Sequence, residues 1–183
     1  MLAGGDGRRI GGDKAMVELE GRPLIAYVLE ALHEVVDDVA VVAKRDTLLP
    51  SLVGHAQVWI EPDEPQHPLC GVVHALKLAR GRPVLVVAVD LPLVDAATLG
   101  ELLAVDLEGA PGVVPVAHGR LQPLCARYAP SALRGLETFD HAARTTDVVR
   151  GLGVKLLEAS DPDAFLNVNR PEDLLQAGAL LGR

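Results

Sequence analysis

Residues 83–92 read Pro83-Val84-Leu85-Val86-Val87-Ala88-Val89-Asp90-Leu91-Pro92. The first seven of them form an apolar run rich in valine, which is typical of a strand covered by helices on both faces of a parallel sheet. We therefore expect residues 83–89 to form the strand at the centre of the sheet. Asp90 then stands where this strand ends, just before a Leu-Pro turn.

Strand-like and helical segments alternate along the rest of the chain. Further strands are expected over 39–43, 57–61, 113–116, 121–128 and 154–158, and helices over 23–35, 69–79 and 95–104 and from Pro171 onward. This alternation predicts an α/β fold, a single Rossmann-like three-layer domain over residues 1–183 with a mostly parallel central sheet.

Composition narrows the class of protein. The chain has 183 residues, of which 49% are hydrophobic and only 3% aromatic, so the core must be built mainly from aliphatic side chains. The net charge of -8 disfavours a nucleic-acid partner, which needs a basic surface. No apolar run approaches the roughly 20 residues of a membrane span, and no signal segment is evident. We expect a cytoplasmic protein without a membrane partner, in which Cys70 and Cys125 are buried thiols.

A glycine-rich segment lies near the start of the chain. It reads Leu2-Ala3-Gly4-Gly5-Asp6-Gly7-Arg8-Arg9-Ile10-Gly11-Gly12-Asp13-Lys14. Glycines allow successive backbone N–H groups to turn toward an anion, and the three cationic side chains supply countercharge. The segment therefore indicates a phosphate-binding loop, with a flexible glycine-rich terminus as the alternative.

This loop and Asp90 are expected to face each other, because ligands of such sheets bind at the carboxyl ends of the strands. A carboxylate opposite bound phosphates favours Mg²⁺, which binds through one or two carboxylates and phosphate oxygens. The alternative is that Asp90 only caps the following turn. The loop lacks the GxxxxGK[ST] order of a P-loop, and a GxGxxG match starting at Gly5 fails at Ile10.

Several segments, in order along the chain, resemble motifs of the MobA-like nucleotidyltransferases, and within that family the match is close to the molybdenum cofactor guanylyltransferases. The first resembles the signature LAGGxSxRMGxDKA, and the others resemble PLAG, CD(T/M)P, QPLxALY and FxNVNTPEDL. The matching segments are Leu2-Ala3-Gly4-Gly5, Arg9-Ile10-Gly11, Asp13-Lys14-Ala15, Pro68-Leu69-Cys70-Gly71, Val89-Asp90-Leu91-Pro92, Gln122-Pro123-Leu124-Cys125-Ala126-Arg127-Tyr128 and Phe165-Leu166-Asn167-Val168-Asn169-Arg170-Pro171-Glu172-Asp173-Leu174.

The resemblance implies a role for each matching position and the fold of the nucleotide-diphospho-sugar transferases. Lys14 and Arg9 would neutralise phosphates, and Asp90 would hold Mg²⁺. Gly4 and the segment 68–71 favour GTP over CTP. The nucleotide-binding residues implied are Leu2, Ala3, Gly4, Gly5, Lys14, Asp63, Leu69, Gly71 and Asp90, and the acceptor-binding residues are Gln122, Pro123, Asn167 and Asn169. Asp63 is placed loosely because loop lengths differ.

The implied reaction transfers GMP from GTP to the terminal phosphate of molybdopterin or the molybdenum cofactor, with release of pyrophosphate. A labile pterin is also compatible with a partner protein that delivers it. Two departures from the family pattern stand out: Lys44 lies where many relatives have Asn, and the first strand is expected to be truncated before Leu2. Three alternatives stay open, namely a cytidylyltransferase or other nucleotidyltransferase of the same fold, a non-catalytic GTP-binding module, and a nucleotide-sugar pyrophosphorylase.

Overall fold

The structure, a computed structural model, describes residues 1–4 and 14–182. Its strands are β1 (Glu18–Leu19), β2 (Arg22–Pro23), β3 (Ala40–Ala43), β4 (Gln57–Ile60), β5 (Val84–Val87), β6 (Gly112–Ala117), β7 (Arg120–Leu121), β8 (Cys125–Tyr128) and β9 (Lys155–Glu158). Its α-helices are α1 (Leu24–His33), α2 (Pro68–Leu78), α3 (Ala96–Ala104), α4 (Ala132–Leu136), α5 (Thr145–Gly151) and α6 (Pro171–Leu181), with short 3₁₀ turns at Lys14–Met16 and Pro162–Phe165.

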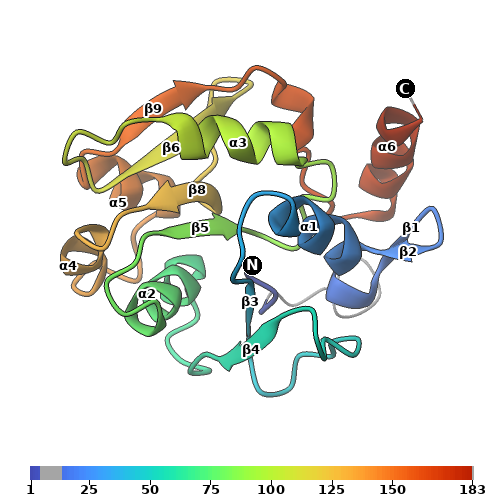
Figure 1. Ribbon diagram of the computed structural model, residues 1–183, viewed down its shortest axis with the longest axis horizontal. Helices are drawn as coiled ribbons and strands as arrows, with labels where there is room; N and C mark the ends of the chain where they lie inside the picture. Colours follow the sequence, from blue (N-terminus) through green and yellow to red (C-terminus); the bar gives the residue numbers. More distant parts are fainter. Residues whose placement is uncertain (5–13, 183) are drawn as a thin grey trace.

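The amino-terminal residues join two groups of strands. Leu2 forms parallel bridges to Val42 in β3 and to Ala88, the residue directly after β5. Its N–H donates to the carbonyl of Val87 (2.8 Å), and the N–H of Ala3 donates to the carbonyl of Val42 (2.8 Å). The amino terminus therefore lies between β3 and β5 (Figure 1).

Through these bridges the strands follow one another in the order β4, β3, residues 1–3, β5, β8, β6 and β9. The strand β5 lies in the middle of this order, as predicted from its valine-rich sequence. The strand β8 runs antiparallel to both of its neighbours, whereas β3 with β4 and β6 with β9 pair in parallel. The sheet is thus mostly parallel, as expected.

Helices cover the sheet on both faces. One apolar cluster joins α1 and α3 to one face, and a second joins α2, α4 and α5 to the other. Consecutive residues of the strands divide between them: Val87 and Val113 belong to the first cluster, and Val86 and Val114 to the second. Successive side chains of a strand point to opposite faces, so the continuous valine runs fill both layers of core.

The predicted strand 121–128 is wrong, because the chain turns inside it. Residues 120–121 form β7, which makes a hairpin with β6 around His118 and Gly119, both at positive φ (48° and 70°). The chain then turns at Pro123, which has no N–H to donate to a ladder. The N–H of Cys125 donates to the carbonyl of Gln122 (3.0 Å), and β8 starts only there.

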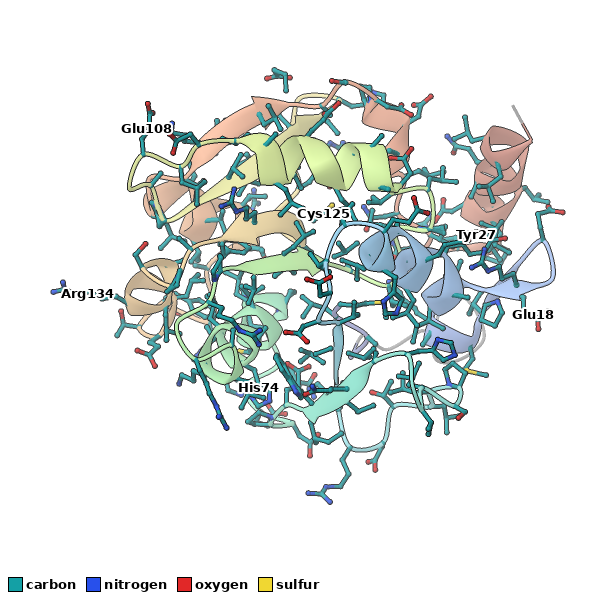
Figure 2. The ribbon with its side chains drawn as sticks, viewed as in Figure 1. Glu18, Tyr27, His74, Glu108, Cys125 and Arg134 are labelled. Carbon is teal, nitrogen blue, oxygen red and sulfur yellow. The ribbon has the colours of Figure 1, made fainter. Side chains whose placement is uncertain are left out.

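Side-chain positions agree with this layering. Figure 2 shows Cys125 inside the molecule, whereas Arg134 and Glu108 project from its surface. Burial raises the pKa of the Cys125 thiol to about 12, so this thiol is inert, as expected. Among the described residues, no helix combines the length and the apolar character required to cross a membrane.

Candidate active site

Three distant parts of the chain meet at Lys14. Its ammonium Nζ donates to Asp90 Oδ2 at 2.7 Å and to Asn169 Oδ1 at 2.5 Å. The side chains of Lys14 and Asp90 are only 14% and 16% exposed. The prediction that the end of the glycine-rich segment and the acid beyond β5 converge is therefore confirmed.

The carboxyl-terminal segment is fixed to this point by backbone contacts. The N–H of Val168 donates to the carbonyl of Asp90 (2.8 Å). Asp173 Oδ2 accepts from the N–H groups of Asn169 and Arg170, both at 2.8 Å, and so caps α6. Asn169 therefore reaches Lys14 from a backbone held both to the end of β5 and to the start of α6.

Asp90 offers one unsatisfied oxygen. Its Oδ1 is buried and has no hydrogen-bond partner among the described residues. A buried carboxylate oxygen without a partner is costly unless a cation or a ligand satisfies it. Among residues 1–4 and 14–182, no cluster of three or more acidic, His or Cys side chains is placed to hold a metal by protein ligands alone. The site thus fits a divalent ion that takes its remaining ligands from phosphates and water, as Mg²⁺ does.

An open cavity of about 370 Å³ lies beside this ion pair. It is bounded by the amino-terminal segment, the end of β5, the loop after β4 and the first turns of α2. Its lining includes Leu2, Gly4, Lys14, Lys44, Glu61, Cys70, Gly71 and Asp90. Its size is within the range of small-molecule sites.

The helix α2 begins at the wall of this cavity because His67 caps it. Nδ1 of His67 accepts from the N–H of Leu69 (3.1 Å), and Nε2 lies 3.2 Å from the carbonyl of Ala143. Pro68 then occupies the first helical position, where its missing N–H costs nothing. This start places Gly71 against the cavity.

Glu61 is a cavity residue that the sequence reasoning missed. Its carboxylate lies between two glycines: a Cβ on Gly4 would stand 2.6 Å from Oε1, and one on Gly71 would stand 3.1 Å from Oε2. The pKa of Glu61 is raised above its ordinary value, mainly because the carboxyl group is partly buried. The positive charge of Lys44 opposes this shift, and the negative charge of Asp63 adds to it. The lack of side chains at Gly4 and Gly71 therefore leaves room for an acid inside the cavity.

Asp63, expected as the acidic nucleotide contact, is exposed and does not line the cavity. Its carbonyl accepts from Lys44 Nζ (2.7 Å). Glu61, directly after β4, is instead the acid of this loop that lines the cavity. Lys44, where the resemblance led us to expect Asn, places a cation on the same wall.

Other predicted residues divide between the cavity and the core. Leu2, Gly4, Gly71 and Asp90, which are predicted to bind the nucleotide, line the cavity. Ala3 and Leu69 do not, because they are 1% and 0% exposed and pack in the core. Cys70, expected to be buried, is only half-buried and lines the cavity.

Of the predicted acceptor residues, Asn169 contacts Lys14, as described above. Asn167, Gln122 and Pro123 do not line the cavity, although the next residue, Leu124, does. Asn167 Nδ2 donates to the carbonyl of Phe165 (3.3 Å), and the carbonyl of Pro123 accepts from the hydroxyl of Tyr128 (2.8 Å). The predicted contacts of Gly5 and Arg9 lie outside the described residues.

Comparison with known proteins gives a consistent set of relatives. Residues 1–159 match the family model described as the MobA-like NTP transferase domain. A molybdenum cofactor guanylyltransferase of Cereibacter sphaeroides is 37% identical, over 99% of this chain and 95% of that protein. A probable molybdenum cofactor guanylyltransferase of Bacillus subtilis is 31% identical, over 94% and 90%.

Solved structures share the fold. The molybdopterin-guanine dinucleotide biosynthesis protein A of Archaeoglobus fulgidus has a TM-score of 0.76 and 25% identity, with 99% of this chain and 96% of that chain covered. The 2-C-methyl-D-erythritol 4-phosphate cytidylyltransferase of Thermus thermophilus has a TM-score of 0.67 and 22% identity, with 96% of each chain covered. The fold alone therefore does not distinguish between nucleotides.

Proposed function

Because the chain belongs to the MobA-like NTP transferase family, we propose that it transfers GMP from GTP to the terminal phosphate of molybdopterin or the molybdenum cofactor and releases pyrophosphate. The observation that carries this proposal is the contact of Lys14 with Asp90 at the edge of a cavity whose walls include Gly4, Gly71 and Glu61. A cation and a carboxylate together at the carboxyl end of a central strand suit a polyphosphate and its metal ion.

The chemistry requires no protein nucleophile. The acceptor phosphate attacks the α-phosphorus of GTP, and the bond to the bridging oxygen of pyrophosphate breaks in line with the attack. A phosphate monoester is largely ionised near neutral pH, since its second pKa is about 6, so no general base is needed. The protein must position both phosphates and stabilise the charge that develops on their oxygens.

Lys14 and Asp90 divide this work in the proposal. Lys14, together with Arg9, would neutralise the phosphates of the leaving group, and Asp90 would hold Mg²⁺. When bound, Mg²⁺ supplies charge stabilisation at the phosphate oxygens. Asn169 orients the Lys14 ammonium, and Gln122, Pro123 and Asn167 are proposed for the acceptor side.

Glu61 is proposed to select guanine. An ionised carboxylate can only accept hydrogen bonds, and the guanine edge that carries N1–H and the N2 amino group offers two adjacent donors. Cytosine carries no such pair of donors. Leu2 and Gly71, on the same walls of the cavity, would contact the base.

The reaction is tested by measuring pyrophosphate release with each of the four nucleoside triphosphates, with and without molybdopterin. We expect release only when GTP and molybdopterin are both present. Release with CTP would instead assign the chain to the cytidylyltransferases. Binding of GTP without any release, at saturating acceptor, would identify a non-catalytic GTP-binding module.

The acceptor is a labile pterin, which makes a delivering protein part of the proposed function. Co-purification of a pterin-carrying protein with this chain would support such a partner. Full activity at low concentrations of free molybdopterin would remove the need for it.

Replacing Glu61 by Gln is expected to raise KM for GTP by about tenfold to a hundredfold, because an amide presents a donor to one of the two guanine donors and charge-assisted hydrogen bonds are lost. The matched control is Asp63→Asn on the same loop, which should leave KM within about twofold because Asp63 is exposed. Steady-state KM values for GTP measure both. A larger effect from Asp63→Asn than from Glu61→Gln would restore the sequence-based assignment.

A pH dependence follows from the raised pKa of Glu61. The ionised form binds guanine, so GTP affinity should fall as the pH decreases through the pKa of Glu61 in the free protein. That pKa lies above the ordinary glutamate value of about 4.3, so the loss should begin at a higher pH than for an exposed glutamate. Calorimetric GTP titrations over a pH series measure the loss, and Glu61→Gln should remove this dependence. An unchanged profile in that variant would exclude the role.

A further inference from the structure

The Lys14 ammonium lies against the carboxylate that is proposed to bind metal. Its Nζ lies 2.7 Å from Asp90 Oδ2 and 2.5 Å from Asn169 Oδ1. The other oxygen of Asp90, Oδ1, is buried and has no partner among the described residues. An ammonium group therefore already pairs with the carboxylate that is proposed to hold the metal ion.

We propose that Lys14 is a place-holding cation, which keeps divalent metal ions off Asp90 until a nucleotide arrives, so that the metal enters together with the triphosphate. This inference rests on the proposed function, since it takes Asp90 as the metal-binding carboxylate. Lys14 then has a second role, because it determines that the metal ion binds with the nucleotide and not before it.

Electrostatic repulsion opposes the binding of a metal ion next to Lys14. A dication and an ammonium cannot both lie against one carboxylate without strong repulsion, and the repulsion is screened poorly because both side chains are mostly buried (14% and 16% exposed). Because both oxygens belong to one carboxylate, a metal ion on either Oδ1 or Oδ2 of Asp90 would lie close to the Lys14 ammonium. A metal ion alone must therefore displace Lys14, and the displaced ammonium would lose its anionic partner.

A bound triphosphate removes this obstacle. Its anionic oxygens offer Lys14 a replacement for Asp90, and they also supply metal ligands that the protein lacks among its described residues. Nucleotide and metal binding are then coupled through one side chain, and the coupling is reciprocal by linkage.

Asn169 fixes the position of the Lys14 ammonium beside Asp90. It accepts from Lys14 through a neutral amide oxygen, so it holds the ammonium without adding a second negative charge. Its backbone is fixed by Asp173, and the neighbouring Val168 is fixed to the carbonyl of Asp90. Lys14 is thus held by two side chains, those of Asp90 and Asn169, whose backbones are themselves fixed by hydrogen bonds.

The test measures metal binding without turnover. Mn²⁺ is titrated into the nucleotide-free protein, and free Mn²⁺ is followed by its electron paramagnetic resonance signal. We expect weak binding by the wild-type protein and at least about tenfold tighter binding by Lys14→Met, which removes the competing charge but keeps the length of the side chain. The double variant Lys14→Met with Asp90→Asn should lose the gain, and Lys77→Met, at an exposed lysine on α2, should bind as the wild type does.

The outcomes separate this inference from the proposed function. Tight, nucleotide-independent Mn²⁺ binding by the wild type that Asp90→Asn abolishes would overturn the place-holder role and leave Asp90 as the metal ligand. A gain in Lys14→Met that survives Asp90→Asn would overturn the metal role of Asp90 and this inference with it. No gain in Lys14→Met would overturn the place-holder role alone. Circular dichroism checks folding, and Lys14→Gln serves as the second charge-removing variant if Lys14→Met does not fold.

Discussion

Replacing Lys14 by Ala is expected to reduce kcat at saturating GTP by at least about a hundredfold, the scale seen when one preorganised charge stabiliser is removed from an active site. Asp90 (2.7 Å) and Asn169 (2.5 Å) hold the ammonium at the wall of the cavity, where bound phosphates can take the place of Asp90 as its anionic partner. Its charge acts most strongly as negative charge develops on the leaving pyrophosphate. Loss of Lys14 therefore lowers kcat and not only the affinity for GTP. Rates of pyrophosphate release at saturating GTP and molybdopterin give the value.

The control for this variant is Lys77→Ala. Lys77 also pairs with a carboxylate, Glu137, at 3.0 Å, but both side chains are about half exposed and lie on the surface between α2 and α4. Exposed pairs contribute little, so kcat should stay within about twofold of the wild type. Near-normal turnover in Lys14→Ala, with thermal unfolding unchanged, would contradict the catalytic role of Lys14.

The sequence predicted the central strand and the alternation of strands with helices well, because both features depend on continuous or periodic runs of apolar residues. The valine-rich run at residues 83–89 can be buried on both faces only inside a covered sheet, and the structure places β5 there. The segment at residues 121–128 is also largely apolar, but it contains Gln122, Pro123 and Arg127. Whether such a chain continues or turns depends on the partner strand, and here the N–H of Gln122 donates to Pro115 on β6 (2.9 Å) before the turn.

The site was predictable where a motif carried the chemistry in one stretch. Asp90 follows the strongest strand, and Lys14 ends the glycine-rich segment, so each had a local signal. Glu61 had none, because it is one of several acids in a proline-rich loop. What distinguishes it is its place between Gly4 and Gly71, which are brought together only by the fold. Leu69 shows the opposite error, since its motif lies at the cavity while its own side chain faces the core.

Asp90→Asn is expected to lower kcat by roughly a hundredfold to a thousandfold and to raise the Mg²⁺ concentration required for half-maximal activity. Asn has nearly the same shape, so the turn after β5 and the backbone contact of Val168 with residue 90 should persist. The variant loses the negative charge that pairs with Lys14 and the anionic oxygen that suits Mg²⁺. Pyrophosphate release measured across a Mg²⁺ titration reports both effects.

The matched control is Asp95→Asn, five residues along the chain. Asp95 is exposed and caps α3 by accepting from the N–H of Thr98 (2.8 Å), and Asn caps helices equally well. This variant removes the same charge near the same turn without touching the cavity, so its Mg²⁺ response should match that of the wild type. If Asp90→Asn also gave a wild-type Mg²⁺ response, Asp90 would not be the metal ligand. Its contact with Lys14 would then serve only to hold the lysine in place for the phosphates.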